Sequence, residues 1–281
     1  MLISTEIGSL NKLGSVQDIL KTLKESGFTA YDYSFCNPIA NDVLYADNYK
    51  EKAQAIRDFA DAIGLPCNQT HAPFPTARKG QEDYNQEIFP VVARSIEISG
   101  ILGAKVCVVH PCNYYTAEEN YELYKSFEPY ARKAGVKIGV ENMWNWANGG
   151  VVSAACSHHD DFRKHLDMLP KDVFVACLDI GHAEMGGLNT SAVQMIETLN
   201  ERLEAIHLHD VDLINDNHSL PYTQKIAFDG VIKAMKKVGY KGDITLEAIN
   251  FFRPLPVELL PVASKYAAEV ARYFANSISE K

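Results

Sequence analysis

The stretch IHLHDVDLINDNHSLP, residues 206–221, marks one strand of the predicted fold and the polar loop that follows it. It begins with apolar positions typical of a buried strand and then holds three histidines and three aspartates. Side chains of this kind just past a strand form either a polar surface loop or part of a metal centre. The metal interpretation requires that other strands of the chain end on matching residues.

Short β-rich runs alternate with longer amphipathic segments along the whole chain. Strands are predicted within residues 2–8, 28–35, 66–72, 105–111, 137–143, 174–182, 203–210 and 243–249. Helices are predicted between them, for example over residues 15–27, 49–64, 228–240 and 255–278, and several helical stretches end on Gly, a usual stop signal. No Pro/Gly/Ser-rich linker divides these units, so we expect one domain over residues 1–281.

The number of β-then-α units predicts an α/β fold, a single (β/α)₈ TIM barrel. Eight such units in about 250 residues close a ring, and no G-x-G-x-x-G turn follows the first strand, as an open dinucleotide-binding sheet would require. Catalytic groups of these barrels lie at the carboxyl ends of the strands. The residues at those ends therefore decide the chemistry.

Six consecutive predicted strands end on a residue that can bind a metal. In chain order these residues are His71, His110, Glu141, Asp179 with His182, His207 and Glu247. Asp216 and His218 follow in the loop after the seventh strand, and we expect them to reach the same site. The polar stretch 206–221 is thus one contribution to a shared centre.

Each of these residues also has a simpler interpretation. A lone strand-end histidine such as His71 or His110 is more often a hydrogen-bonded or substrate-facing group than a ligand. Glu141 and Glu247 lie between apolar neighbours, in GVENM and TLEAI, where an unpaired charge is costly. Both glutamates therefore require a salt bridge or a cation, and a metal is the better prediction.

The sixth and seventh strands each offer a pair of candidate groups. Asp179 and His182 could form a helix cap, but Gly181 between them permits a tight turn that directs both inward. His207 and His209 point to the same side because side chains alternate along a strand. We favour His207 as the ligand and His209 as a substrate-facing or supporting group.

Other polar residues near these strands receive more ordinary predictions. Asp210 either orients a ligand histidine or pairs with a neighbouring cation. Arg253, six residues beyond Glu247, is expected in a surface salt bridge, with a phosphate or carboxylate as the alternative partner. The three histidines within residues 158–165 lie in a predicted helix and are expected to be exposed to solvent.

At these residues the sequence resembles the xylose isomerase-like TIM barrel superfamily. This superfamily includes sugar isomerases and epimerases, inosose dehydratases and the endonuclease IV type of DNA repair enzyme. The resemblance is carried by HAPF at 71–74, HP at 110–111, EN at 141–142, LDIGH at 178–182, HLHD at 207–210, DNHSLP at 216–221 and LEA at 246–248.

The resemblance implies a ligand set and also shows departures. It implies that one divalent ion is bound by Glu141, Asp179, His207 and Glu247, and that His71, His110, His182, Asp216 and His218 match the positions of a three-metal cluster in the endonuclease branch. Ketose 3-epimerases carry a Glu where this chain has Ala147 and an Arg where it has Leu213. Many relatives have Gly-x-Gly where this chain has Tyr222-Thr223-Gln224.

Three carboxylates and one imidazole favour Mn²⁺, with Mg²⁺, Co²⁺ and Zn²⁺ as alternatives. Such an ion would polarise a sugar carbonyl and stabilise the enediolate formed when a neighbouring proton leaves. Glu141 and Glu247, from different strands, would remove and return that proton. We therefore expect a divalent-metal-dependent isomerase or epimerase of sugars or polyols.

The substrate is expected to be a small sugar or polyol. The residues assigned to bind it are His71, His110, His182, His209, Trp144 and Phe251. No Gly-rich phosphate loop is visible, so a phosphorylated substrate has no support from a motif. The alternatives are an endonuclease IV-like multi-zinc phosphodiesterase, an inosose-type dehydratase, and a binding barrel without turnover.

Composition and charge indicate which kinds of partner and which cellular compartment to expect. The chain has 281 residues, 47% of them hydrophobic and 22% charged, which is typical of a soluble globular protein. A net charge of −9 disfavours nucleic acid as a partner. The absence of a long apolar run or a basic N-terminal leader predicts a cytoplasmic protein without a membrane partner, and a homo-oligomer is compatible with the sequence.

Overall fold

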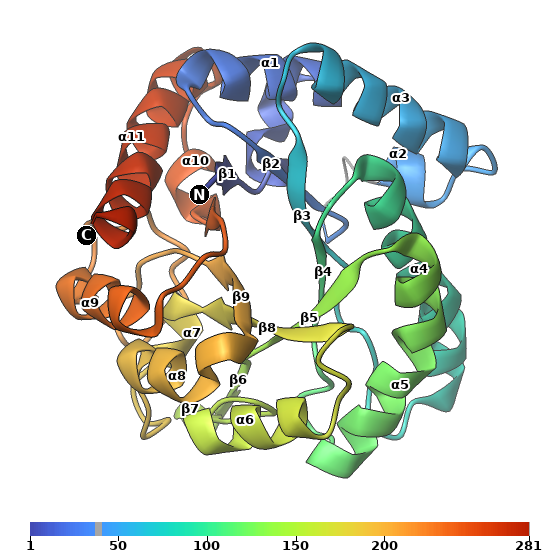
Figure 1. The fold of residues 1–281 in the computed structure, drawn as a ribbon, viewed down its shortest axis with the longest axis vertical. Helices are drawn as coiled ribbons and strands as arrows, with labels where there is room; N and C mark the ends of the chain where they lie inside the picture. The colour runs from blue at the N-terminus through green and yellow to red at the C-terminus, as the bar shows by residue number, and fades with distance from the viewer. Residues whose placement is uncertain (37–40, 281) are drawn as a thin grey trace.

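The computed structural model describes residues 1–36 and 41–280 of the chain. Within these residues, eight parallel strands follow the order predicted from the sequence (Figure 1). They are β1 (Ile3–Thr5), β2 (Tyr31–Ser34), β3 (Cys67–His71), β4 (Val106–Val109), β5 (Lys137–Glu141), β8 (Phe174–Asp179), β9 (Leu203–His207) and β10 (Ile244–Leu246). Each lies inside the corresponding predicted stretch.

The strands close into a barrel. A continuous sheet runs in the order β2-β3-β4-β5-β8-β9, and β1 pairs with β10 beside it. Two parallel bridges, Glu6 with Asp32 and Leu208 with Leu246, join these parts. Backbone hydrogen bonds join the same pairs of segments, from Ile7 N to Asp32 O at 3.1 Å and from Glu247 N to Leu208 O at 3.1 Å. The predicted TIM barrel is confirmed.

Helices surround the barrel in a ring (Figure 1). The ring comprises α1 (Val16–Ser26), α3 (Tyr49–Ala62), α4 (Glu82–Leu102), α5 (Ala117–Ala134), α6 (His159–Asp167), α8 (Ala192–Leu199), α9 (Phe228–Val238) and α11 (Leu260–Ser279). Each helix contacts the next, and α11 contacts α1. Shorter elements are α2 (Asn41–Leu44), α7 (Ile180–Ala183), α10 (Ile249–Phe252) and the 3₁₀ helices Gly8–Leu13, Asn200–Arg202 and Val257–Leu259.

Local sequence signals account for several helix ends. Ser15 begins α1 with a capping box completed by Asp18, and Thr116 begins α5 in the same way with Glu119. These side chains satisfy backbone N–H groups that have no partner within the helix. α5 ends on Gly135 in the left-handed conformation, which a residue without a Cβ adopts without strain.

The hydrophobic core has two parts, as the alternation of side chains along a strand requires. Outward-facing residues such as Cys107 and Val109 of β4 belong to the large cluster that also includes the inner faces of the helices. The intervening Val106 and Val108 belong to a small separate cluster with Val175, Cys177 and Ala205 from β8 and β9. This small cluster fills the barrel interior, so close-packed apolar side chains lie directly beneath the polar residues at the strand ends.

A hairpin that the sequence interpretation did not predict follows β5. β6 (Trp144–Ala147) and β7 (Gly150–Ser153) pair antiparallel, with Asn148 and Gly149 at positive φ between them. An Asn-Gly pair is a strong signal for this type of turn. Of the helices in the described ranges, none has the length and apolarity that crossing a membrane would require.

Candidate metal centre

A cavity of about 470 Å³ opens where the barrel strands end. Its wall includes many of the residues predicted from the sequence to form the site, namely His71, His110, Glu141, His182, Asp216, His218 and Glu247. The cavity is large enough for a small metabolite. The structure therefore brings together groups that are up to 176 residues apart in the chain, as between His71 and Glu247.

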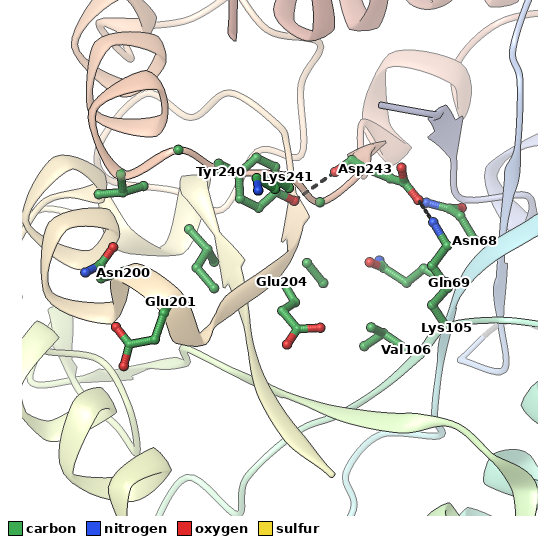
Figure 2. Close-up of a pocket in the computed structure, with 15 residues that line it drawn as sticks. Asn68, Gln69, Lys105, Val106, Asn200, Glu201, Glu204, Tyr240, Lys241 and Asp243 are labelled. Atoms are coloured by element: carbon green, nitrogen blue, oxygen red, sulfur yellow. Dashed lines mark hydrogen bonds and ion pairs between the residues drawn. The ribbon is translucent and has the colours of Figure 1, made fainter. Parts of the chain in front are cut away.

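A second cavity, of about 400 Å³, lies among the residues where β4, β9 and β10 begin (Figure 2). Several of its polar groups already pair with one another. The Nζ of Lys105 lies 3.2 Å from Oδ2 of Asp243, and the hydroxyl of Tyr240 donates to the carbonyl of Asp243 at 2.9 Å. Since active sites of barrels lie at the opposite, carboxyl end of the strands, the first cavity is the candidate site.

Four buried residues form the centre of that site, and we call them the primary group: Glu141, Asp179, His207 and Glu247. One potential ligand atom from each lies within 4.8 Å of those of the others. The Nδ1 of His207 is 3.1 Å from Oε1 of Glu141 and 3.3 Å from Oε2 of Glu247. The ends of β5, β8, β9 and β10 thus converge on one point.

The donor set of the primary group fits a divalent cation. Three carboxylates share a space from which water is nearly excluded, because each residue is at most 6% exposed. Oε2 of Glu141 is buried without a hydrogen-bond partner in the described chain. Burying several like charges together is costly unless a positive charge compensates them. Hard oxygen ligands with one imidazole suit Mn²⁺, Mg²⁺ or Zn²⁺.

The two glutamates of the primary group differ in protonation. Burial raises the pKa of Glu247 to about 8. Burial acts on Glu141 in the same direction, but the adjacent His207 and His110 outweigh it and hold the pKa of Glu141 well below its usual range. Burial would also lower the pKa of His207, yet Cys177 and the glutamates raise that pKa well above normal. Near neutral pH, Glu141 is ionised and Glu247 is protonated.

A second set of possible ligands adjoins the first, and we call it the secondary group: His182, His209, Asp216 and His218. Oδ2 of Asp216 lies 3.2 Å from Nε2 of His182 and 3.0 Å from Nε2 of His218. The Nδ1 of His182 is 3.8 Å from Oε1 of Glu141, so the two groups are contiguous. The loop after β9 therefore reaches the site, as its sequence indicated.

His71 and His110 form the side of the cavity next to Glu141. Their Nε2 atoms are 3.0 Å apart, so one ring donates a hydrogen bond to the other. Oε2 of Glu141 lies 3.6 Å from Nε2 of His71 and 3.2 Å from Nε2 of His110. Burial, with a contribution from His110, lowers the pKa of His71 to about 3. His71 is therefore neutral and available as an acceptor or a ligand.

Asn142 is a positioning residue that the sequence interpretation overlooked. Its amide Nδ2 donates to the carbonyl of Asp179 at 2.9 Å, and its Oδ1 accepts from Asp179 N at 2.8 Å. Its own carbonyl accepts from Nδ1 of His182 at 2.9 Å. Asn142 thus ties β5 to β8 and fixes both Asp179 and His182. The only sequence signal was its place beside Glu141.

His209 and Asp210 support the site from behind. The Nε2 of His209 lies 2.9 and 3.0 Å from the two carboxylate oxygens of Asp179, and His209 is fully buried outside the cavity wall. Among residues 1–36 and 41–280, Asp210 makes no hydrogen bond to a histidine and no ion pair with a cation. It accepts the backbone N–H groups of Val211, Gln224 and Ile226, so it holds the loop that carries the secondary group.

Two aromatic residues assigned to substrate lie elsewhere. Trp144, on β6, is partly buried against the core, and its carbonyl accepts from Nδ2 of Asn113 at 3.2 Å. Phe251 packs against Phe252, with ring centroids 5.1 Å apart. Neither lines the cavity, whereas Phe74 does.

The prediction of exposed histidines in α6 is wrong for His165. This residue is only 3% exposed, because its Nδ1 donates to the carbonyl of Asp161 at 2.8 Å and its ring faces Asn120 of α5. Helix periodicity placed the residue on a helix, but the face it occupies depends on the neighbouring helix.

A profile of the family described as xylose isomerase-like TIM barrel matches residues 20–268. The uncharacterized protein MJ1311 of Methanocaldococcus jannaschii is 27% identical over 191 residues, which cover 64% of this chain and 64% of that protein. The uncharacterized protein y4fM of Sinorhizobium fredii is 23% identical over 284 residues, covering 89% of this chain and 85% of its own.

Solved structures share the fold at low sequence identity. A D-tagatose 3-epimerase-like protein superposes with a TM-score of 0.75 at 19% identity, covering 99% of this chain and 98% of its own. The IolI protein with a bound zinc atom gives 0.77 at 13% identity, with coverage of 99% and 98%. D-psicose 3-epimerase in the presence of D-fructose gives 0.74 at 12%, with coverage of 97% and 99%.

Proposed function

The chain belongs to the xylose isomerase-like TIM barrel family, and on that premise we propose that it is a divalent-metal-dependent isomerase or epimerase of sugars or polyols. The observation that carries the proposal is the primary group itself. Three buried carboxylates surround one imidazole at the inner end of a cavity of about 470 Å³. The names of the structural neighbours, which include a D-tagatose 3-epimerase-like protein and a D-psicose 3-epimerase, agree with this chemistry.

All four residues of the primary group are proposed to bind the ion, and the two glutamates are also proposed to transfer a proton. Glu141, Asp179, His207 and Glu247 would hold the ion, which supplies Lewis-acid polarisation of the substrate carbonyl. Glu141 and Glu247 approach from different strands, so Glu141 is suited to remove a proton from the carbon next to that carbonyl and Glu247 is suited to return it. Return to the same carbon from the opposite face gives epimerisation, and return to the neighbouring carbon gives isomerisation.

The surroundings of the primary group support proton transfer. Both glutamates are almost completely shielded from bulk water, which strengthens their electrostatic interactions with a bound substrate. Asn142 holds Asp179 through two hydrogen bonds, and His209 contacts both of its oxygens. This support keeps the carboxylate in one orientation, as a reactive site requires.

We favour Mn²⁺ as the ion because carboxylate oxygens dominate the primary group. The residues at two positions argue against a ketose 3-epimerase in particular. Ala147 lies exposed on β6 and Leu213 is a partly buried loop residue, where the resemblance would require a glutamate and an arginine. Neither side chain can donate a hydrogen bond to a sugar hydroxyl.

The secondary group favours a second candidate, a multi-zinc phosphodiesterase of the endonuclease IV kind. Ligand atoms of three histidines and Asp216 lie within 4.8 Å of one another next to the primary group, and histidines shift the preference toward Zn²⁺. The net charge of −9 opposes this candidate, because a DNA duplex requires cationic contacts. One bound ion per chain supports the isomerase, and about three zinc ions support the hydrolase.

The test is proton exchange. The Mn²⁺-loaded protein is incubated in D₂O with a panel of ketoses, inososes and keto-glycosides, and NMR follows deuterium at the carbon next to the carbonyl. Exchange with one class of substrate is expected, and loss of a β-hydroxyl in the same assay identifies the dehydratase variant of this chemistry. Cleavage of an abasic-site duplex without exchange on any sugar would overturn the proposal. We also propose that the protein is cytoplasmic.

A further inference from the structure

Arg253 differs from the other arginines of the chain. It follows α10 and lines the cavity of the primary group. Its guanidinium makes no hydrogen bond, ion pair or ring contact with any residue among 1–36 and 41–280. The other seven arginines each donate to a carbonyl or side-chain oxygen. The predicted surface salt bridge of Arg253 is therefore wrong within the described chain.

A second cation is held beside Arg253. The Nζ of Lys12, on the 3₁₀ helix Gly8–Leu13, donates to the carbonyl of Arg253 at 2.7 Å and to that of Leu255 at 2.9 Å. An ammonium has three donors, so one is left for a further acceptor. Lys12 lines the same cavity as Arg253, together with Ser9 and Asn11.

The cavity thus carries charges of both signs. Glu141 and Glu247 line it and are buried, whereas Lys12 and Arg253 line it and are exposed to solvent. Residues after the first and the last strand of the barrel supply these two cations, and β1 and β10 are paired neighbours. Barrels frequently bind phosphate with loops that follow the last strands. A neutral sugar could offer these two cations only uncharged acceptors.

We propose that the substrate carries a terminal oxyanion, either a phosphate monoester or a carboxylate, which Arg253 and Lys12 bind. This inference rests on the proposed function and adds the substrate class to it. The planar guanidinium binds such an anion through two parallel hydrogen bonds, and the ammonium adds a third contact. The carbonyl end of the substrate then faces Glu141 and Glu247.

Binding rather than turnover tests this inference. Isothermal titration calorimetry compares glucitol, glucitol 6-phosphate and gluconate, which have no aldehyde or ketone group and so cannot form an enediolate. We expect at least one of the two anions to bind roughly ten- to a hundred-fold more tightly than glucitol, as charge-assisted hydrogen bonds allow. A preference for the phosphate identifies a sugar phosphate as the substrate, and a preference for the carboxylate identifies a sugar acid.

Two variants and a matched control show which residues cause the preference for the anion. Arg253→Gln should abolish the preference for the anion and leave the affinity for glucitol unchanged, and Lys12→Gln should reduce the preference. Lys233→Gln removes the same charge from an exposed position on α9 outside the cavity, and the preference should stay intact. Anion binding that is equally strong in Arg253→Gln would overturn the inference, because the anion would then bind elsewhere.

These experiments distinguish a failure of the anion site from a failure of the proposed isomerase activity. Equal binding of all three probes by the wild-type protein overturns the inference, while deuterium exchange on a neutral sugar would still support an isomerase. An intact anion preference together with no exchange on any phosphorylated or acidic sugar supports the anion site and overturns the isomerase.

Discussion

Gly181 lies directly against the imidazole of His209. A Cβ on Gly181 would come within 2.0 Å of Cε1 and 2.5 Å of Nε2 of that ring, which is closer than any real contact. The same Nε2 lies within 3.0 Å of both carboxylate oxygens of Asp179. Glycine at this position is therefore what lets His209 support a residue of the primary group.

Gly181→Ala should displace His209 and loosen Asp179. We expect the free energy of unfolding to fall by about 1–3 kcal/mol, as for overpacked cores, and metal affinity to fall with it. The matched control is Gly150→Ala, where a Cβ meets nothing within 4 Å and which should not lower stability. Chemical denaturation measures both variants. In a His209→Ala background, an undiminished cost of Gly181→Ala would refute the contact as its cause.

Glu247→Gln should abolish the return of the proton while keeping nearly the same shape. Loss of general acid–base catalysis typically lowers kcat by about 10²- to 10⁴-fold. Metal content measured on the same sample separates lost chemistry from lost metal. Glu204→Gln, in the cavity of Figure 2, is the control and should retain full activity. Normal turnover by Glu247→Gln would remove Glu247 from the mechanism.

Metal affinity should rise with pH between 6 and 8. Burial raises the pKa of Glu247 to about 8, so this carboxyl is protonated at pH 7 and must lose its proton to bind a cation. His207, whose pKa is raised well above normal by Cys177 and the glutamates, must lose a proton as well, so the association constant should increase by at least about tenfold per pH unit. Titration calorimetry in two buffers of different protonation enthalpy counts the protons. An affinity independent of pH between 6 and 8 would contradict this protonation state.

Asp210→Ala should unfold the loop that carries the secondary group. Asp210 is fully buried and accepts three backbone N–H groups, all of which would lose their partner. We expect a loss of about 3–5 kcal/mol in the free energy of unfolding. Asp212→Ala is the control, because this partly exposed aspartate accepts, within the described residues, only from Ile214 and Asn215 of its own turn, and its loss should cost under about 1 kcal/mol. Equal effects of the two substitutions on thermal unfolding would contradict this role.

The barrel and its convergent strand ends could be predicted because their signals are local. The alternation of short β-rich runs with amphipathic segments predicts that His71, Glu141 and His207 lie at strand ends. The closed ring of strands then brings those ends together. The hairpin β6–β7 carried a local signal too, the Asn148-Gly149 pair, but it interrupts the β-then-α order on which the prediction relied.

Contacts between distant segments could not be predicted. The sequence suggested that Gly181 was needed for backbone freedom, yet Gly181 has no positive φ and its value lies in the space it leaves for His209. Nothing in the sequence near Arg253 shows that its guanidinium has no partner among residues 1–36 and 41–280, or that Lys12 lies beside it, because these facts depend on the pairing of β1 with β10.

The central claim is that Glu141, Asp179, His207 and Glu247 jointly bind one catalytic ion. Anomalous diffraction at the manganese edge, from crystals soaked in Mn²⁺, tests it most directly. We expect a peak between these four side chains, at roughly 2.0–2.2 Å from an oxygen of each carboxylate and from a nitrogen of His207. Crystals with no peak there, or with Mn²⁺ bound only in the cavity of Figure 2, would contradict it.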